Sequence, residues 1–170
     1  MSSTDELVHY DDIFRPMRRM KQAVSREECI ELLKTERRGV LSVVGDNGYP
    51  YGVPINHYYD EETGQLYFHG GKIGHRVDAV KGCNKVCYTV FDKGCLKPGD
   101  WALNVKSVII FGRISIVEDE ARAIDLCRRL SYKFTDDENY INDEIEKCAK
   151  ATLVMELTVE HMTGKLVNEK

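Results

Sequence analysis

The sequence predicts an α+β, mostly β fold, in which about six antiparallel strands form a small barrel with helices at its periphery. Turn-forming segments at Gly45–Gly48 and Asp60–Gly64 join successive strand-like segments. Turns this short require antiparallel pairing, because a parallel pair needs a crossover of about a dozen residues or more. Helical patterns lie near residue 25, after Gly74 and between residues 118 and 150, so a doubly wound nucleotide-binding fold is excluded.

The first predicted helix begins at Ser25, where Ser-Arg-Glu-Glu forms a capping box. We expect this helix to end at Gly39 and a short apolar strand to follow over residues 40–44. The next strand covers residues 49–59, in which apolar side chains alternate. It contains two prolines, which predict an edge strand or a bulge because proline donates no hydrogen bond to a sheet.

The second half of the chain alternates between strand-like and helical patterns. Gly112 interrupts a long β-branched segment and predicts a bulge or bend there. The expected elements after the Asp60–Gly64 turn are, in order, a strand over 65–69, a helix over 75–80, strands over 85–91 and 104–117, helices over 118–134 and 138–150, and a strand over 152–159.

Length and charge indicate one ordinary globular domain. The chain has 170 residues, with 24 Lys+Arg against 28 Asp+Glu and a net charge of −4. A chain of this size buries roughly 70% of its unfolded surface without metals or disulfides. The excess of acid argues against a nucleic-acid partner. We divide the chain into an N-terminal arm over 1–24 with a small basic cluster, a domain over 25–165 and a polar tail over 166–170.

The chain shows no pattern for membrane insertion, export or metal binding. No apolar run approaches the roughly 20 residues of a membrane helix, and the polar start is unlike a signal peptide. We therefore expect a cytoplasmic protein without a membrane partner. The six cysteines contain no Cys-x-x-Cys pair and fit no common metal-binding spacing. They are expected to be buried or bystander thiols, because free cysteine packs like a small apolar residue.

A glycine-rich segment after the strand over 65–69 carries the clearest chemical signal. It presents Lys72, His75 and Arg76 at the expected start of a helix, with Gly70, Gly71 and Gly74 around them. Glycines allow close approach of backbone N–H groups, a helix N-terminus favours anions, and arginine binds phosphate through two hydrogen bonds. The segment therefore predicts an anion site, although a glycine turn with surface cations would look the same.

Two histidines lie near this loop on the predicted hairpin. His57 and His69, together with Asn56, are placed on adjacent strands by the short turn between them. No carboxylate is positioned to orient either imidazole, so a catalytic triad or a zinc site is poorly supported. Aromatic residues around the hairpin could stack a flat heterocycle or simply pack in the core. These aromatic residues are Tyr49, Tyr51, Tyr58, Tyr59, Tyr67, Phe68 and Trp101.

Four segments of the chain resemble, in this order, the FMN-binding split-barrel family related to pyridoxamine phosphate oxidase. The resemblance is stronger to its Nim-type branch, which is associated with nitroimidazole resistance. The segments are Arg38-Gly-Val-Leu-Ser, Asn47-Gly-Tyr-Pro-Tyr-Gly-Val-Pro-Ile-Asn56, Leu66-Tyr-Phe-His-Gly-Gly-Lys-Ile-Gly-His-Arg76 and Lys106-Ser-Val-Ile-Ile-Phe-Gly-Arg113.

This resemblance implies a split β-barrel homodimer with FMN bound in clefts at the subunit interface. His75 and Arg76 match the family's pair of cations that hold the FMN phosphate, with Lys72 as a further cation, and His69 falls on the histidine proposed as functional in the Nim-type branch. We take His69 as the candidate catalytic residue. The other implied flavin contacts are Val53, Pro54, Ile55, Asn56, His57, Phe68 and Ser107.

The chain also departs from true pyridoxamine phosphate oxidases. His57 stands where those oxidases have a basic residue, and His75-Arg76 stands where they have Arg-Lys. Their substrate-binding Arg and Trp near the C-terminus have no counterpart here. Oxidation of pyridoxamine phosphate is therefore not expected, and Lys72 could supply the charge that the phosphate site lacks.

Three functional hypotheses remain open at this point. The first is an FMN-dependent oxidoreductase that reduces a small, electron-poor molecule such as a nitro-aromatic, with NAD(P)H as donor. The second is a non-catalytic module that stores or carries flavin or haem, with His57 or His69 as an axial ligand. The third is a dimerisation domain with an empty cleft.

Overall fold

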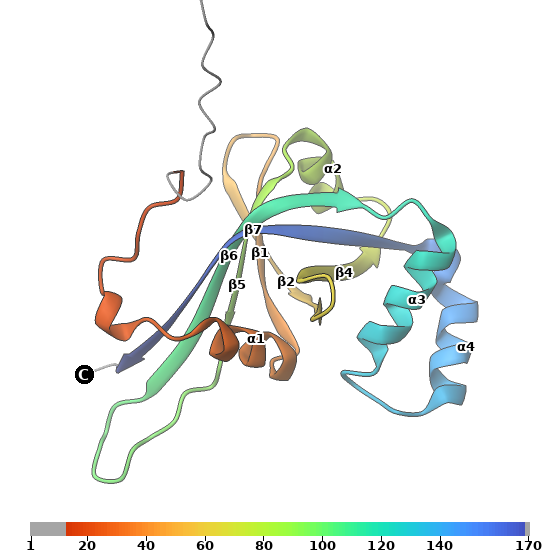
Figure 1. The fold of residues 1–170 in the computed structure, drawn as a ribbon. Coiled ribbons are helices and arrows are strands. Elements are labelled where there is room, and N and C mark those ends of the chain that lie inside the picture. The colour runs from red at the N-terminus through yellow and green to blue at the C-terminus, as the bar shows by residue number, and fades with distance from the viewer. Residues whose placement is uncertain (1–12, 169–170) are drawn as a thin grey trace, which may run out of the picture.

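The computed structural model describes residues 13–168, which form one curled antiparallel sheet with helices around it (Figure 1). The predicted α+β barrel is confirmed, with seven strands in the order β2-β1-β5-β6-β7-β4-β3. The strands are β1 (Arg38–Val44), β2 (Pro50–Asn56), β3 (Tyr58–Asp60), β4 (Gln65–Gly71), β5 (Lys85–Phe91), β6 (Asn104–Ile116) and β7 (Thr152–Asn168). The helices are α1 (Arg26–Thr35), α2 (His75–Gly82), α3 (Glu120–Ser131) and α4 (Glu138–Cys148), with short 3₁₀ turns at Met20–Gln22 and Ala149–Ala151.

The two edges of the sheet lie next to each other in the chain. β2 and β3 are the edge strands, yet His57 alone separates them. Because one residue spans only about 3.5 Å, the sheet must curl until its edges meet. The edges meet without pairing, which leaves a split between β2 and β4. The two prolines predicted to mark an edge strand do lie in β2.

Both predicted hairpin turns are present. Gly48 and Gly64 adopt positive φ angles of 79° and 70°, which glycine tolerates at no steric cost. β1 pairs with β2 from Val44 opposite Pro50 to Arg38 opposite Asn56. The first hairpin therefore determines which side chains of β1 stand beside β2.

Helix α1 closes one end of the barrel with Cys29, Leu32 and Leu33 in the main core. Its predicted capping box is present, since the backbone N–H of Ser25 donates to Glu28 Oε2 at 3.1 Å and that of Glu28 to Ser25 Oγ at 3.2 Å. The sequence predicted that this helix ends at Gly39, but α1 ends at Thr35.

Gly39 instead belongs to β1, where it allows the chain to pass over the ring of Tyr88. A Cβ atom at Gly39 would lie 2.7 Å from the Tyr88 side chain, closer than real Cβ contacts. The residue is therefore a close-packing glycine in a strand, and Arg38 begins the sheet.

Strands β6 and β7 form a long ribbon across the molecule. Their register shifts between Phe111 and Gly112, which confirms the predicted irregularity at Gly112. β7 continues to Asn168, so the expectation that it ends at residue 159 before a polar tail is wrong. The tail is held because Asn104 at the start of β6 pairs with Asn168.

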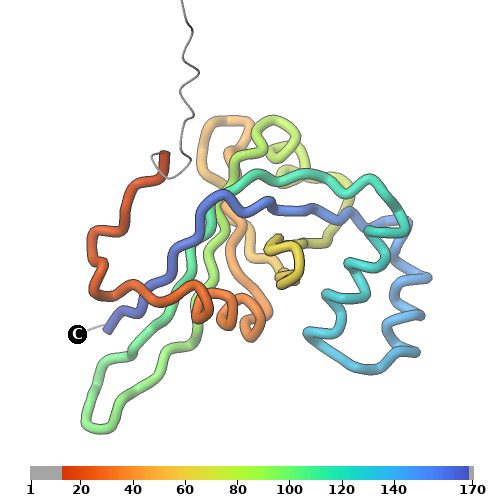
Figure 2. The backbone as a smooth tube through the Cα atoms, viewed as in Figure 1, coloured from red at the N-terminus to blue at the C-terminus, as the bar shows by residue number. Residues whose placement is uncertain are grey.

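Helices α3 and α4 lie at one end of the molecule, and the β5–β6 connection lies at the other (Figure 1 and Figure 2). α3 and α4 form a helical hairpin beside the barrel (Figure 1). Leu126 of α3 packs on Tyr67 and Val154. At the other end the β5–β6 connection projects away from the barrel (Figure 2). None of the described helices is long and apolar enough to cross a membrane.

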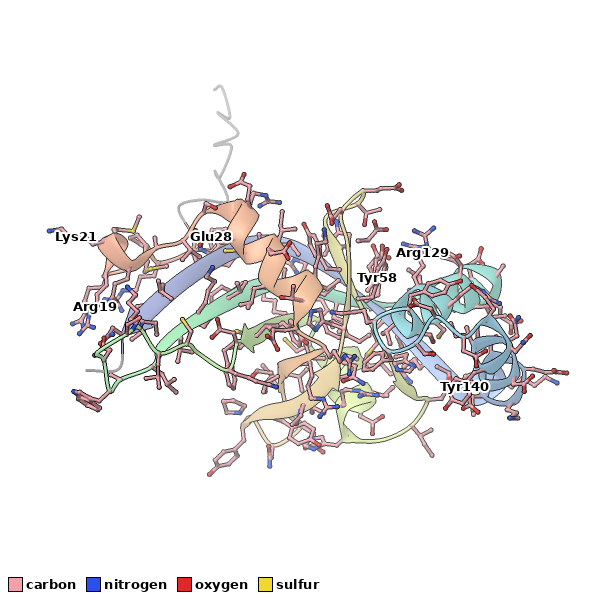
Figure 3. All side chains as sticks on the ribbon, turned by 90° about the horizontal axis from the view of Figure 1, so that it is seen from below. Arg19, Lys21, Glu28, Tyr58, Arg129 and Tyr140 are labelled. Carbon is pink, nitrogen blue, oxygen red and sulfur yellow. The ribbon has the colours of Figure 1, made fainter. Side chains whose placement is uncertain are left out.

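The described part of the N-terminal arm packs on the β6–β7 ribbon. Val24 N–H donates to Gly164 O at 3.1 Å, and Phe14 stacks on His161 with ring centroids 4.7 Å apart. Arg19 and Lys21 lie at the end of the molecule opposite Tyr140 of α4 (Figure 3). Residues 1–12 of the predicted arm lie outside the described residues.

Candidate functional site

The split between β2 and β4 contains an open cavity of about 340 Å³. Pro54, Ile55 and Asn56 of β2 line one side and His69 of β4 lines the other, while Arg38 reaches it from β1. Four of these five residues are predicted site residues. The structure thus brings the predicted site residues of β2 and β4 together in one open pocket.

Arg38 is the lining residue that the sequence-based list of site residues did not include. Its Nε donates to Asn56 Oδ1 at 3.1 Å, and the two residues are direct partners in the β1–β2 register. The sequence did contain information on this pair, because the Gly45–Gly48 turn determines which residue of β1 stands opposite Asn56. Arg38 was missed because the first helix was expected to run to Gly39.

Arg76 spans the split close to His69. Its guanidinium lies against Gly70 of β4, where any Cβ atom would overlap it, and it is close enough to Tyr51 of β2 for an electrostatic interaction. The Nε atom is buried and has no hydrogen-bond partner among the described residues. Burial lowers the pKa of Arg76, but an arginine stays charged in proteins. An unpartnered, partly buried guanidinium is suited to an anion.

The imidazole of His69 is half-buried in the cavity. Burial, with a smaller contribution from the charge of Arg76, lowers the pKa of His69 below its usual 6.5. The ring is therefore neutral at pH 7 and can donate one hydrogen bond and accept another. This environment is compatible with a role in proton exchange or in ligand binding.

The glycine loop places His75 and Lys72 differently from Arg76. His75 stacks on Tyr51, with ring centroids 4.4 Å apart, and its Nε2 lies 3.4 Å from Asp46 Oδ1. Lys72 is exposed on the loop. Gly74 precedes α2 with φ of 127° and provides no side-chain cap, so backbone N–H groups at the start of α2 remain available to an anion.

His57 is a core residue, contrary to the prediction that its imidazole contacts the cofactor. The side chain is fully buried, with Nε2 2.8 Å from Leu33 O and Nδ1 2.8 Å from the Tyr88 hydroxyl. A carbonyl only accepts, so Nε2 carries the proton and Nδ1 accepts from Tyr88. Both nitrogens are occupied, which also excludes His57 as an axial haem ligand.

The other predicted contacts divide between the pocket, the core and a distant part of the sheet. Phe68 is fully buried and packs edge-on against Tyr88, so its side chain faces the core. Val53 lies on β2 opposite Leu41. Ser107 lies on β6, where it pairs with Phe91 of β5 and Lys165 of β7. β6 is three strands away from β2 in the sheet. Ser107 therefore does not line the cavity.

A second cavity of about 460 Å³ lies between the β3–β4 turn and α3, where Tyr58 and Arg129 are neighbours (Figure 3). Its cations already have partners in the protein. Lys34 pairs with Glu61, and Arg129 Nε lies 2.7 Å from Asp125. Lys133 donates to Leu33 O at 3.0 Å and to Glu36 O at 2.6 Å, and burial lowers its pKa to about 8. Arg38 lines the first cavity and Arg76 lies close to its His69, and neither arginine takes part in an ion pair within residues 13–168. The first cavity is therefore the better candidate for an anionic ligand.

Comparison with known proteins agrees with this architecture. A family model described as pyridoxamine 5'-phosphate oxidase matches residues 25–166. The chain belongs to that family. No curated protein matches it. Among residues 13–168 there is no cluster of three or more His, Cys, Asp or Glu side chains that could hold a metal ion.

Several solved structures share the split-barrel fold at low sequence identity. The flavocytochrome Anf3 from Azotobacter vinelandii has a TM-score of 0.76 at 20% identity, over 93% of this chain and 75% of that one. A candidate 5-nitroimidazole antibiotic resistance protein from Bacteroides thetaiotaomicron has a TM-score of 0.72 at 19% identity, over 86% and 87%. The FAD and haem binding protein from Mycobacterium smegmatis has a TM-score of 0.68 at 22% identity, over 88% and 74%.

The burial of His57 predicts a specific dependence of stability on pH. Burial lowers the pKa of His57 from its usual 6.5 to about 3, so below pH 6.5 the unfolded chain binds a proton that the folded chain excludes. The free energy of unfolding should fall by about 1.4 kcal/mol per pH unit on acidification within this window. Urea denaturation between pH 7 and 4 measures the slope.

The ring itself provides an independent check. In ¹⁵N-detected spectra, His57 should remain the neutral Nε2–H tautomer at pH 4. A His57 signal that titrates near pH 6.5 would contradict the buried placement.

Proposed function

We propose that the protein is a flavin-dependent oxidoreductase that binds FMN in the split between β2 and β4. The observation that carries this proposal is the buried Nε of Arg76, which has no hydrogen-bond partner within residues 13–168 and lies close to His69 of the open cavity. Membership of the pyridoxamine 5'-phosphate oxidase family and the flavoproteins among its structural neighbours support it. FMN would offer an anionic phosphate to Arg76 and a flat ring to the cavity.

The residues present fit such a cofactor. Arg76, Lys72 and the first N–H groups of α2 would hold the phosphate, and Gly70 leaves the space that the Arg76 guanidinium needs. Pro54, Ile55 and Asn56 would lie along the ring system. Bound FMN would take two electrons as hydride from a reduced nicotinamide and pass them to the substrate.

The protein's own contribution to the chemistry is proposed to lie mainly at His69. Its neutral imidazole lines the cavity and can hold or release a proton at a ring nitrogen as the substrate is reduced. We propose a small, electron-poor substrate such as a nitro-aromatic. The resemblance to the Nim-type branch and the solved structure with a nitroimidazole-resistance name support this choice.

We further propose a homodimer that completes the flavin cleft. Val40, Thr89 and Ile109 follow one another across the outer face of β1, β5 and β6, and Cys87 lies in the next row of the same face. Val40 and Cys87 are partly exposed, and Ile109 keeps 39% of its surface accessible. A second copy would cover this apolar face. It would also bring its own Ser107 toward the cleft. The predicted contact between Ser107 and the flavin would then be made by the Ser107 of the second copy.

Replacing Arg76 tests the phosphate site. The Arg76→Ala change should weaken FMN binding by about tenfold to a hundredfold, because charge-assisted hydrogen bonds contribute about 1.5–3 kcal/mol. Adding Lys72→Ala should weaken binding further. Lys81→Ala is a matched control, since Lys81 is exposed in the last turn of the same helix. FMN fluorescence quenching gives each dissociation constant.

The spectrum of the purified protein separates the alternatives. A flavin spectrum that bleaches with NADPH supports the oxidoreductase. A flavin that NADPH never reduces indicates a storage or carrier module, and a Soret band that is lost in His69→Ala indicates haem binding through His69. A protein that ignores both ligands contradicts a cofactor-binding role.

The proposed dimer has its own test. Ile109→Asp should convert the dimer to monomer in sedimentation velocity at micromolar concentration, because a buried unpaired charge opposes association. Ile124→Asp is the control, since Ile124 of α3 is equally exposed, at 38% against 39%, but lies outside the proposed interface. A monomeric wild-type protein would rule out the dimer.

A further inference from the structure

We propose that Arg38 selects an anionic substrate, a small planar carboxylate that lies in the cavity with its charged group against the guanidinium. This inference rests on the proposed function and names the substrate class of the same site. It goes beyond a role in cofactor binding, because Arg38 stands one strand beyond the split, on β1.

The geometry around Arg38 fixes one side of its guanidinium and leaves the other side open. Nε donates to Asn56 Oδ1 at 3.1 Å, which orients the planar group over the end of β2. Nη1 and Nη2 form no hydrogen bond within residues 13–168, and Arg38 lines the cavity directly. Two parallel N–H groups on a fixed guanidinium match the two oxygens of a carboxylate.

The charges around the cavity favour an anion at this position. None of the ion pairs in the described part of the chain involves Arg38. The facing side chain is the neutral His69, and the floor is formed by the apolar Pro54 and Ile55. The chain as a whole carries a net charge of −4, so a local unpaired cation is a specific attraction rather than a general one.

Arg38 and Arg76 approach the split from different elements. Arg76 belongs to α2, and its guanidinium lies against Gly70 of β4, where its charge acts on His69. Arg38 belongs to β1 and stands opposite Asn56 in the β1–β2 register. A phosphate held by Arg76, Lys72 and the start of α2 would leave Nη1 and Nη2 of Arg38 available for a second ligand.

Two compounds of the same shape test this assignment. 4-Nitrobenzoate carries a carboxylate where 4-nitrobenzamide carries a neutral amide, and both offer the same nitro group for reduction. With the FMN-loaded protein and NADPH, 4-nitrobenzoate should have a KM about tenfold lower than the amide. Arg38→Gln should remove this preference, and Arg38→Lys, which keeps the charge without the fork, should retain part of it.

The neighbouring arginine is the matched control. Arg37 is exposed, lies over the Phe134 ring at 5.3 Å and does not line the cavity. Arg37→Gln should therefore keep the full preference for 4-nitrobenzoate. Equal KM values for the two compounds in the wild-type protein, or an equal loss in both glutamine variants, would overturn the inference.

Failure of the proposed function would give a different result. If the protein binds no FMN, calorimetric titration of 4-nitrobenzoate and 4-nitrobenzamide into the flavin-free protein still tests Arg38. Binding of the carboxylate that is lost in Arg38→Gln and kept in Arg37→Gln would support the anion site. Absence of such binding would overturn it. If FMN binds and is reduced but the charge preference is missing, the oxidoreductase stands and the assignment of Arg38 fails.

Discussion

A single residue, His57, connects β2 to β3, and this short connection determines how the sheet closes. His57 must carry the chain from one edge of a seven-stranded sheet to the other, so the sheet has to close on itself. The imidazole is held in the core by the α1 carbonyl of Leu33 and by Tyr88 of β5. A buried polar ring is costly unless both nitrogens are paired, so this arrangement also fixes the end of α1 and the middle of β5 relative to the split.

The split that results from this closure is the feature that makes a binding site possible. An edge of β2 and a face of β4 come together without hydrogen bonds between them, and side chains of α2 and β1 reach into the gap. Arg76 lies against Gly70 next to His69, and Arg38 lies beside Asn56. The split thus combines two arginines from different elements with the apolar Pro54 and Ile55 and the polar Asn56 and His69, and such a lining suits an anionic ligand with a flat apolar part.

Much of this arrangement could be predicted from local chemistry. The hairpins follow from glycines that tolerate positive φ, and the α2 loop follows from its glycines and cations. Two placements could not be predicted because they depend on tertiary contacts. The burial of His57 requires knowledge that β2 ends at Asn56, and the strand position of Gly39 depends on the Tyr88 ring that passes over it. Arg38 was consequently assigned to a helix end, and its place in the cavity was not foreseen.

We propose that the split holds the phosphate of FMN at Arg76, and ³¹P NMR of FMN reports on that contact. In the presence of excess protein, the FMN phosphate signal should shift and should remain dianionic through about pH 6, where a free phosphate monoester titrates. The cause would be the Arg76 guanidinium, whose buried Nε has no hydrogen-bond partner within residues 13–168. A ³¹P signal that titrates as in free FMN would contradict the account.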